Sequence, residues 1–278
     1  MKICDLHTHS YYSDGTFSPT ELVEEAKRVG LLAIALTDHN NVGGIEEFSL
    51  ACERLGIEGV FGTEFSTDYK QTELHLLGLF IPKDKLEKVN SFCEVVINNK
   101  EESNKIMIDR LQRAGYEISY DEVKAVCSGT MNRAHIGEVL YKKGYTSTVE
   151  EVFDTILSKK GSIYQQAKRL DVFETIEFIR SIGAVPVLAH PFLDLDEKGL
   201  REFLTLAVPK GLVGMETVYS TYTEAQTLLA KQIANEFNLK ESGGSDFHGY
   251  RKEDISLATG RGNLVIPYEF YQNLRPKH

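Results

Sequence analysis

The chain has 278 residues, and its 42% of hydrophobic and 26% of charged residues are typical of a folded globular protein. The formal net charge is −10, which disfavours a protein that holds long nucleic acid through its own positive charge. The apolar runs fall short of the roughly 20 residues that span a membrane, and the first residues do not resemble a signal peptide. The four cysteines are widely spaced, so we expect free thiols in a cytoplasmic protein: Cys4, Cys52, Cys93 and Cys127.

The N-terminal part alternates β-type runs with helical segments. Residues 18–30 predict a helix in which Ser18 is the N-cap, Glu21 completes a capping box and Gly30 ends the helix. A short polar connection between the last two strands of this part predicts a hairpin. The expected strands cover residues 2–7, 31–39, 59–67 and 72–80, and a second helix covers residues 43–56.

The same alternation returns after residue 170. Strands alternating with helices predict a parallel α/β sheet, and this many units in one chain predict a barrel. The expected helices cover residues 172–183, 199–208 and 223–237, and the expected strands cover residues 184–191, 211–219 and 240–248.

Residues 83–170 differ from the rest, because they have helical periodicity and no convincing strand. We expect an α-helical insertion that caps the active-site face of a barrel, since barrel active sites lie at the C-terminal strand ends. The expected domains are a metal-binding barrel, residues 1–82 and 171–278, and an insertion, residues 83–170.

Histidines gather at the ends of the predicted strands. A single histidine on an apolar strand is most often a core residue with its own hydrogen bonds. Six of the eight histidines lie at or beside matching strand ends, which is hard to explain in that way. The six are His7, His9, His39, His75, His190 and His248; His135 and His278 lie elsewhere.

The spacing of two histidines suits a metal ion. Side chains two positions apart in a strand lie on the same face, so His7 and His9 can present two imidazoles to one ion. Asp246 and His248 repeat this spacing near the last predicted strand end. A helical site would instead need a spacing of three or four residues.

Further candidate ligands come from other strand ends. Asp14 lies in the loop after the first strand, Glu64 lies in strand 59–67, and His190 precedes Pro191, which favours extended backbone. A catalytic ion typically takes about three protein ligands and keeps one position open, so this set predicts two or three ions. Imidazoles and carboxylates without thiolates favour Mn, Fe or Zn, and we expect Mn first. The nine candidates are His7, His9, Asp14, His39, Glu64, His75, His190, Asp246 and His248.

Six stretches, DLHTHSYYSDG, ALTDHN, GTEFS, ELHLLG, AHP and GSDFH, together resemble the PHP (polymerase and histidinol phosphatase) family. The resemblance covers nearly the whole chain and is strongest to the stand-alone bacterial nucleotide phosphatases and RNA 5′-exonucleases. It implies a distorted seven-stranded (β/α) TIM-like barrel with a trinuclear metal site. By this resemblance His7, His9, Glu64 and Asp246 would bind one ion, Glu64, His75 and His190 a second, and Asp14, His39 and His248 the third.

Such a site implies hydrolysis of phosphate esters by a metal-bound hydroxide. Three divalent ions would add about six positive charges and make the site attractive to phosphate despite the acidic chain. The expected substrates are phosphorylated small molecules, nucleotides or short RNA rather than duplexes. The specific candidates are nucleoside 3′,5′-bisphosphates, nucleoside 5′-monophosphates and the 5′-ends of RNA. The residues expected at the reaction centre are Asp14, His39, Glu64, His190 and His248.

Two residues of the insertion resemble a substrate-binding element of the family. Arg133 and His135 match its Arg-x-His pattern, which implies contact with the substrate phosphate. A guanidinium group can hold phosphate through two hydrogen bonds. The alternative, a surface arginine beside a histidine on a helix face, stays open.

The chain departs from the family pattern after Tyr164. Many relatives have a proline and a basic residue there, whereas residues 165–167 of this chain are Gln, Gln and Ala. If that basic residue selects a second phosphate, this chain prefers a different ester. Lys168 or Arg169 could replace it.

Four other polar or aromatic residues adjoin the expected site. Asp38 precedes His39 and would point to the opposite face of a strand, so we expect it to orient a ligand imidazole or loop amides. Glu216 lies at the strand end that would line the pocket. Tyr11 and Tyr12 lie in the loop beside the metals and could stack on a base.

Three other functions compete with a nucleotide phosphoesterase. A histidinol-phosphatase-like enzyme would act on a small phosphorylated molecule. An amidohydrolase-type barrel also begins with His-x-His, but it would use a bridging lysine, whereas the bridging position here is expected to be Glu64. A noncatalytic metal-binding or regulatory module would keep the ligands without turnover.

Overall fold

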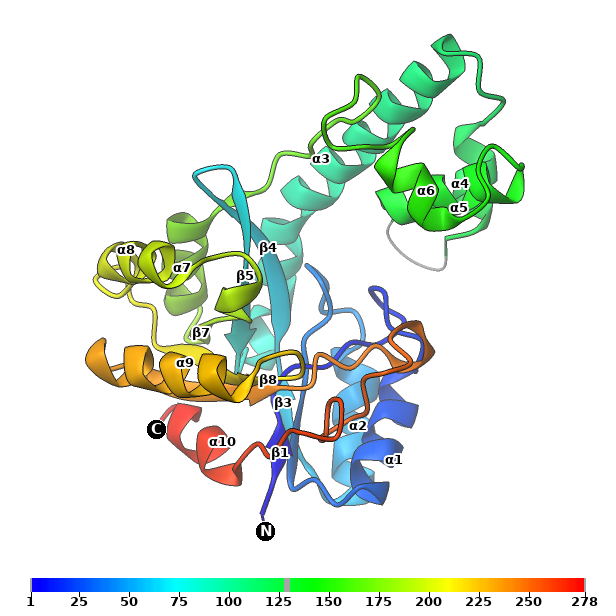
Figure 1. Cartoon of the computed structure of the whole chain (residues 1–278). Helices are drawn as coiled ribbons and strands as arrows, with labels where there is room; N and C mark the ends of the chain where they lie inside the picture. The colour runs from blue at the N-terminus through cyan, green and yellow to red at the C-terminus, as the bar shows by residue number, and fades with distance from the viewer. Residues whose placement is uncertain (1, 128–130, 278) are drawn as a thin grey trace. The chain divides into compact units, whose positions relative to one another are not determined.

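The structure of the chain is a computed structural model that describes residues 2–127 and 131–277 (Figure 1). It is a mixed α/β protein that divides into two compact units. We name them the strand unit, Met1–Cys93 with Leu170–His278, and the helical unit, Glu94–Arg169.

The first strands of the strand unit form a three-stranded parallel sheet in the order β1-β2-β3. One helix follows each of the first two strands, which is the alternation expected from the sequence. The elements are β1 (Cys4–Asp5), α1 (Pro19–Arg28), β2 (Ala33–Leu36), α2 (Ile45–Leu55) and β3 (Glu58–Phe61).

Local sequence signals determine where α1 begins and ends. The Ser18 hydroxyl accepts the backbone N–H of Glu21, and the Glu21 carboxylate accepts the N–H of Ser18, so the predicted capping box is confirmed. After the helix, Gly30 has a φ of 81°, a left-handed conformation that glycine adopts without strain.

A six-stranded sheet has the order β6-β4-β5-β7-β8-β9. The hairpin predicted from the sequence is confirmed, because β4 and β5 are antiparallel neighbours. β5 is also antiparallel to β7, and the remaining pairs are parallel. The strands are β4 (Thr63–Tyr69), β5 (Thr72–Leu79), β6 (Leu170–Asp171), β7 (Val185–Leu188), β8 (Gly214–Tyr219) and β9 (Lys240–Gly244).

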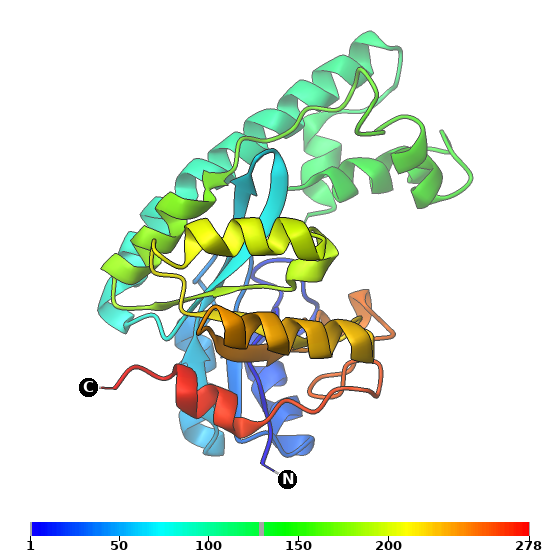
Figure 2. The ribbon, with the colours of Figure 1, turned by 60° about the vertical axis from the view of Figure 1, so that its left-hand side comes forward.

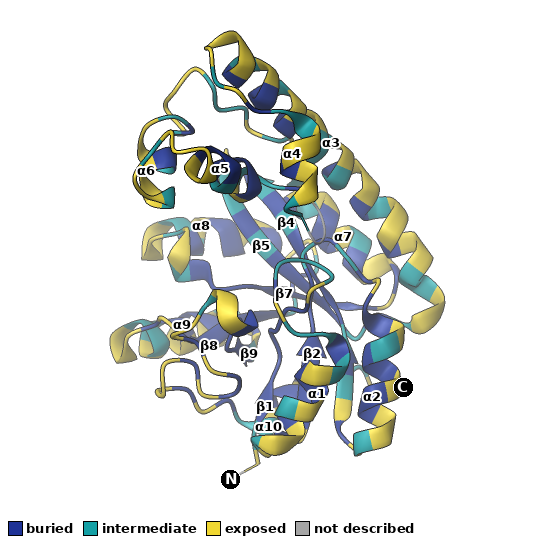
Figure 3. Ribbon diagram, turned by 90° about the vertical axis from the view of Figure 1, so that its right-hand side faces the viewer, coloured by how far each residue is buried: buried dark blue, intermediate teal, exposed yellow. Residues whose placement is uncertain are grey.

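Helices surround the strands of this unit (Figure 2). α7 contacts β4, β5 and β7, and α9 contacts β8 and β9. The strands are mostly buried, whereas the helices have one buried and one exposed side (Figure 3). The helices are α7 (Val172–Ser181), α8 (Glu197–Ala207), α9 (Glu224–Glu236) and α10 (Tyr268–Leu274), with the 3₁₀ helices η1 (Lys83–Lys85), η2 (Pro191–Leu193) and η3 (Gly249–Arg251).

Backbone hydrogen bonds connect the two sheets beyond the named strands. The N–H of Leu6, after β1, donates to the carbonyl of Gly243 in β9 at 3.1 Å. The N–H of Glu64 in β4 donates to the carbonyl of Thr37, after β2, also at 3.1 Å. The strand pairing itself defines two sheets, so it gives a mixed α/β architecture and does not give the single closed seven-stranded barrel that was expected.

The helical unit has its own hydrophobic core. α3 runs from the strand unit into the helical unit, since Val89 and Cys93 near its start pack in the core of the strand unit. Leu111 in its last turns packs with residues of the shorter helices. The helices are α3 (Leu86–Arg113), α4 (Tyr120–Ala125), α5 (Arg133–Lys142) and α6 (Val149–Asp154).

Some details of the structure differ from the sequence prediction, and others agree with it. The expected strand 59–67 is interrupted at Gly62 and forms β3 and β4, while β6 and α10 were not predicted. All four cysteines are free, as expected. Among the described residues, no helix combines the length and the apolar character needed to span a membrane.

Candidate metal centre

The structure brings the nine predicted ligands together in the strand unit. Each of the nine offers a ligand atom that lies within 4.8 Å of the ligand atoms of at least two others. His7 and His9 follow β1, His39 follows β2, Glu64 lies in β4, His75 in β5, His190 after β7, Asp246 and His248 after β9, and Asp14 in the loop before α1.

The most buried group contains the two histidines of the first motif. Nε2 of His7 and Nε2 of His9 are 3.1 Å apart. Oε2 of Glu64 lies 3.3 and 3.2 Å from these two nitrogens. Oδ1 of Asp246 lies 3.6 Å from Nε2 of His7 and 3.2 Å from Nε2 of His9. Two imidazole nitrogens and two carboxylate oxygens therefore face one point.

The other carboxylate oxygen of Glu64 belongs to a second group. Oε1 lies 2.7 Å from Nδ1 of His75 and 3.0 Å from Nε2 of His190. Because Oε1 and Oε2 face different imidazoles, Glu64 can bridge two ions.

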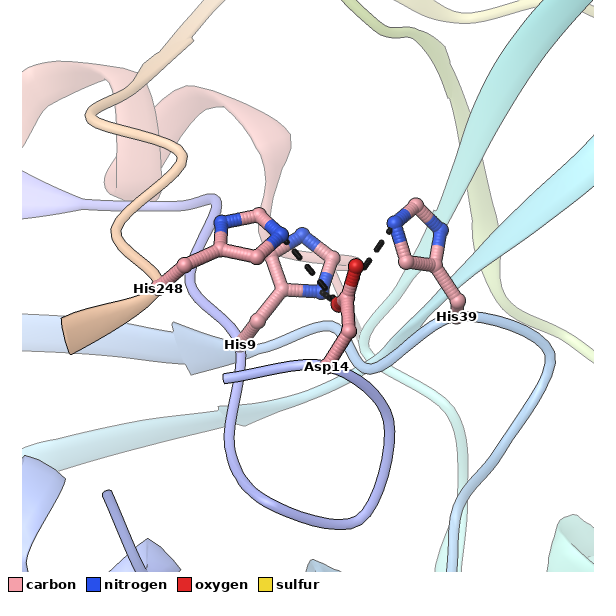
Figure 4. Close-up of side chains that lie close together, drawn as sticks. All are labelled: His9, Asp14, His39 and His248. Carbon is pink, nitrogen blue, oxygen red and sulfur yellow. Dashed lines mark ion pairs between the residues drawn. The ribbon is translucent and has the colours of Figure 1, made fainter. Parts of the chain in front are cut away.

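The third group surrounds Asp14 and is drawn in Figure 4, in which His9, His39 and His248 converge on its carboxylate. Oδ1 of Asp14 lies 3.2 Å from Nε2 of His248, 3.8 Å from Nε2 of His39 and 3.9 Å from Nδ1 of His9. Nδ1 of His39 also lies 3.0 Å from Oε2 of Glu64. The three groups therefore share members and form one continuous centre.

Unpaired polar atoms in this centre fit metal ions. Oε2 of Glu64 and the Nδ1 atoms of His39 and His190 are buried and make no hydrogen bond among the described residues, although three imidazole nitrogens lie within 3.3 Å of Oε2. A buried carboxylate oxygen without a partner is costly unless a cation neutralises it. Imidazoles and carboxylates without thiolates are the donors that Mn, Fe and Zn accept. The donor set and its unpaired atoms therefore fit divalent transition metals.

The surroundings shift the pKa values of this centre so that its carboxylates are ionised and the imidazole of His39 is neutral. Burial would raise the pKa of Glu64, Asp246 and Asp14, but the surrounding imidazoles outweigh it and hold all three well below their usual values. Burial lowers the pKa of His39 to about 3. Burial also opposes protonation of His75, but the Glu64 carboxylate raises its pKa to about 10. Metal binding would displace that proton, because metal ligands must be deprotonated.

Asp38 supports the loop that carries Asp14. Its carboxylate accepts the backbone N–H of Ser10 at 2.7 Å and the hydroxyls of Ser10 and Ser13, each at 2.7 Å. The prediction that Asp38 orients loop amides is therefore confirmed.

Glu216 has a larger part in the site than its sequence position indicated. Its side chain is fully buried, with Oε1 3.1 Å from Nδ1 of His7 and Oε2 accepting the backbone N–H of His190 at 2.7 Å. The prediction of extended backbone at His190 is wrong, since its φ is 25° and its ψ is 54°. The hydrogen bond to Glu216 and the 3₁₀ helix that begins at Pro191 accompany this strained conformation.

Sequence reasoning missed three residues that support the centre. Oδ2 of Asp246 accepts hydrogen bonds from the Tyr219 hydroxyl and the Lys252 ammonium, each at 2.7 Å. Asp5 is fully buried and accepts the backbone N–H groups of Ser245 and Ala258 at 2.9 Å. Burial raises the pKa of Asp5 to about 6. Only the position of Asp5 two residues before His7 could have indicated it.

The predicted substrate residues lie in the helical unit. The guanidinium of Arg133 stacks over the rings of Phe153 and Tyr164 and donates to the carbonyl of Leu157 at 3.2 Å. His135 is buried, and its Nδ1 accepts the N–H of Asn132 in the cap of α5. Their contact with substrate stays a prediction.

Tyr11 and Tyr12 contact each other in the loop after β1. Their rings are stacked with centroids 4.9 Å apart, and the Tyr11 hydroxyl donates to Glu47 at 3.2 Å. The stacking of either ring on a nucleobase stays a prediction.

Comparison with curated proteins finds relatives of similar length. A 5′-3′ exoribonuclease of Haemophilus influenzae is 34% identical over 245 residues, which cover 88% of this chain and 89% of the relative. A 3′,5′-nucleoside bisphosphate phosphatase of Chromobacterium violaceum is 28% identical over 254 residues, which cover 89% of this chain and 88% of the relative.

Comparison with solved structures agrees with these relatives. The crystal structure of a candidate metal-dependent phosphoesterase from Bifidobacterium adolescentis superposes with a TM-score of 0.81 at 27% identity, covering 98% of this chain and 95% of that one. The sequence profile of the PHP domain matches residues 5–165, which include six of the nine clustered side chains. On these matches, the chain belongs to the PHP domain family.

Proposed function

We infer that this chain is a metal-dependent phosphoesterase that hydrolyses phosphate esters of nucleotides or short oligonucleotides. The observation that carries the inference is the convergence of imidazole and carboxylate groups on both oxygens of Glu64, a buried bridging carboxylate. A lysine would stand at this position in an amidohydrolase-type site, so the bridging glutamate favours the phosphoesterase.

The nine clustered side chains are proposed to hold two or three divalent ions, with Mn preferred over Fe and Zn. When bound, such ions lower the pKa of water and neutralise the charge of phosphate oxygens. The proposed division among the ions is the one that the family resemblance implies: one at His7, His9, Glu64 and Asp246, one at Glu64, His75 and His190, and one at Asp14, His39 and His248. The distances around Glu64 and Asp14 support it.

The open side of the centre indicates where a phosphate enters. The side chains of Asp14, His39 and His75 are 28%, 23% and 19% exposed, whereas His7 and His9 are fully buried. Substrate therefore approaches past Asp14, His39 and His75. The buried His7 and His9 would hold an ion on the inner side, away from solvent.

The relatives support a substrate that carries a nucleotide phosphate. One is named for 5′-3′ cleavage of RNA and another for removal of phosphate from nucleoside bisphosphates. We propose the same substrate class here, with Arg133 and His135 of the helical unit as phosphate contacts. Free thiols at all four cysteines support a cytoplasmic location.

The proposed architecture is a distorted seven-stranded barrel that carries the helical unit as an insertion. Two backbone hydrogen bonds support closure, because that from Leu6 to Gly243 joins the end of β1 to β9 and that from Glu64 to Thr37 joins β4 to the segment after β2. With β3 and β4 counted as one interrupted strand, the ring contains β1, β2, β3–β4, β5, β7, β8 and β9.

Elemental analysis tests the metal centre. Protein purified without chelator should contain more than one equivalent of transition metal per chain. Glu64→Gln removes the bridging charge and should lower both the metal content and the turnover. Glu224→Gln, the same change at an exposed residue of α9, is the matched control and should change neither. A metal-free protein that retains full activity would contradict the proposal.

A substrate screen with added Mn²⁺ identifies the ester. The panel contains p-nitrophenyl phosphate, histidinol phosphate, nucleoside 5′-monophosphates, nucleoside 3′,5′-bisphosphates and short 5′-phosphorylated RNA. We expect the highest kcat/KM on a nucleotide or RNA substrate. Hydrolysis of an amide or lactone in place of every phosphate ester would favour the amidohydrolase, and binding of metal without any turnover would favour a regulatory module.

A further inference from the structure

We propose that Glu216 is a positioning residue that couples two ion positions of the metal centre. The proposal rests on the metal assignment given above. Glu216 lies in β8, its side chain is fully buried, and its two oxygens contact two different candidate ligands. It faces the centre without being one of the nine proposed ligands.

The contact with His7 determines which nitrogen of that imidazole is available. Nδ1 of His7 lies 3.1 Å from Oε1 of Glu216, so the proton of a neutral imidazole resides on Nδ1 and is donated to the carboxylate. Nε2 then keeps its lone pair, and it is Nε2 that lies 3.3 Å from Glu64 and 3.6 Å from Asp246. Carboxylates that accept from a ligand imidazole in this way orient it and increase its basicity.

The contact with His190 determines a backbone conformation. Oε2 of Glu216 accepts the backbone N–H of His190. His190 has a φ of 25° and is followed by Pro191. A non-glycine residue keeps such a conformation only where its surroundings hold it there. The conformation places Nε2 of His190 3.0 Å from Oε1 of Glu64. Glu216 thus holds one imidazole through its ring and the other through its backbone.

Two other residues of β8 contact fewer of the candidate ligands than Glu216 does. The Tyr219 hydroxyl bonds to Oδ2 of Asp246, a ligand of the ion that His7 also binds. The Thr217 hydroxyl bonds to Oε2 of Glu241 at 2.8 Å and does not contact the nine clustered side chains in any hydrogen bond found among the described residues. These neighbours allow matched variants within one strand.

The experiment compares Glu216→Gln, Tyr219→Phe and Thr217→Val in the full chain. An amide cannot accept both hydrogen bonds that Glu216 accepts, and its NH₂ group would face a donor. Mn²⁺ or Co²⁺ is titrated into chelator-treated protein, with bound metal counted by elemental analysis and Co²⁺ followed by its visible absorption. Thermal unfolding of each metal-free variant is measured in parallel.

We expect Glu216→Gln to weaken metal binding by about 10- to 100-fold at two classes of site, the ion position that includes His7 and the one that includes His190. Tyr219→Phe should weaken one class only. Thr217→Val should lower the unfolding temperature of the metal-free protein and leave the metal affinities unchanged. The coupling would be overturned if Glu216→Gln weakened metal binding at no more than one class of site. It would also be overturned if Thr217→Val weakened metal binding as much as Glu216→Gln does.

Two further results keep the test decisive. If Glu216→Gln does not fold, the Nδ1–H proton of His7 is sought by NMR in wild-type protein loaded with Zn²⁺. A proton protected from exchange supports the contact, and a freely exchanging Nδ1 overturns it. Wild-type protein that binds no metal would contradict the proposed function, whereas wild-type binding with an unaffected Glu216→Gln would contradict only the coupling.

Discussion

Asp14 is a candidate ligand that lies in a loop, between β1 and α1. Gly15, its neighbour, permits the turn, because a Cβ atom there would lie 2.4 Å from the carbonyl oxygen of His9. Asp38 holds the start of the same loop through Ser10 and Ser13. The loop therefore presents the Asp14 carboxylate to His39 and His248 from the more exposed side of the centre.

Replacing Asp14 should affect one ion more than the others. Asp14→Ala removes the only carboxylate of the third proposed ion, so we expect that ion to be lost at micromolar free metal and turnover to fall by at least about tenfold. Metal content by elemental analysis and kcat on the best phosphate ester measure this. Asp254→Ala, at an exposed aspartate, is the control. Unchanged metal content and rate in Asp14→Ala would contradict the assignment of Asp14.

The proximity of most candidate ligands was predictable because they follow the carboxyl ends of strands, whereas His75 lies within the antiparallel strand β5. His7 and His9 share a face by their spacing, and parallel strands bring their ends to one edge of a sheet. The contacts of Glu216 were not predictable, since they join residues 209 and 26 positions apart in the chain. Neither was the backbone of His190, where a local preference before proline was overridden by long-range contacts.

At the scale of elements, the sequence predicts best what local chemistry controls. The start of α1 follows from hydrogen bonds between Ser18 and Glu21, which lie within one helical turn. β6 contains only Leu170–Asp171 and exists through pairing with β4, so it has no periodicity of its own. The contact between the end of β1 and β9 likewise joins residues at opposite ends of the chain, since the N–H of Leu6 donates to the carbonyl of Gly243.

Gly244 tests the contact between these two strands. A Cβ atom on Gly244 would lie 2.2 Å from Cβ of His7 and 2.8 Å from its backbone nitrogen, a clash that only a shift of β1 or β9 could relieve. Gly244→Ala should therefore reduce the free energy of unfolding by about 1–3 kcal/mol or more and displace His7. Chemical denaturation and metal titration measure the two effects.

Ser18→Ala is the comparison for Gly244→Ala. Loss of the α1 cap should cost about 1 kcal/mol without moving His7. Metal affinity should therefore fall in Gly244→Ala and stay unchanged in Ser18→Ala. Wild-type metal affinity in Gly244→Ala would mean that the strands accommodate the methyl group and that their close approach does not position His7.

At the scale of the whole molecule, the chain contains separate hydrophobic cores. The core of the helical unit includes Leu111, Val123, Ile136 and Leu140, and it is distinct from the clusters of the strand unit. All nine clustered side chains lie in the strand unit. A ligand that binds only one folded unit stabilises that unit by mass action.

Metal should therefore raise the stability of one unit selectively. At a free metal concentration 100 times the Kd, the gain is about 2.7 kcal/mol per site, which raises the unfolding temperature of a unit of this size by about 5–10 °C. We expect calorimetry of the full chain to resolve two transitions and a chelator to lower only that of the strand unit. Hydrogen exchange should assign the transitions, with amides around Leu111 and Ile136 unchanged by metal and amides around Glu64 and Glu216 more protected. Equal metal-dependent protection of both units would contradict the separation, because it would require the ions to stabilise a core that contains none of their ligands.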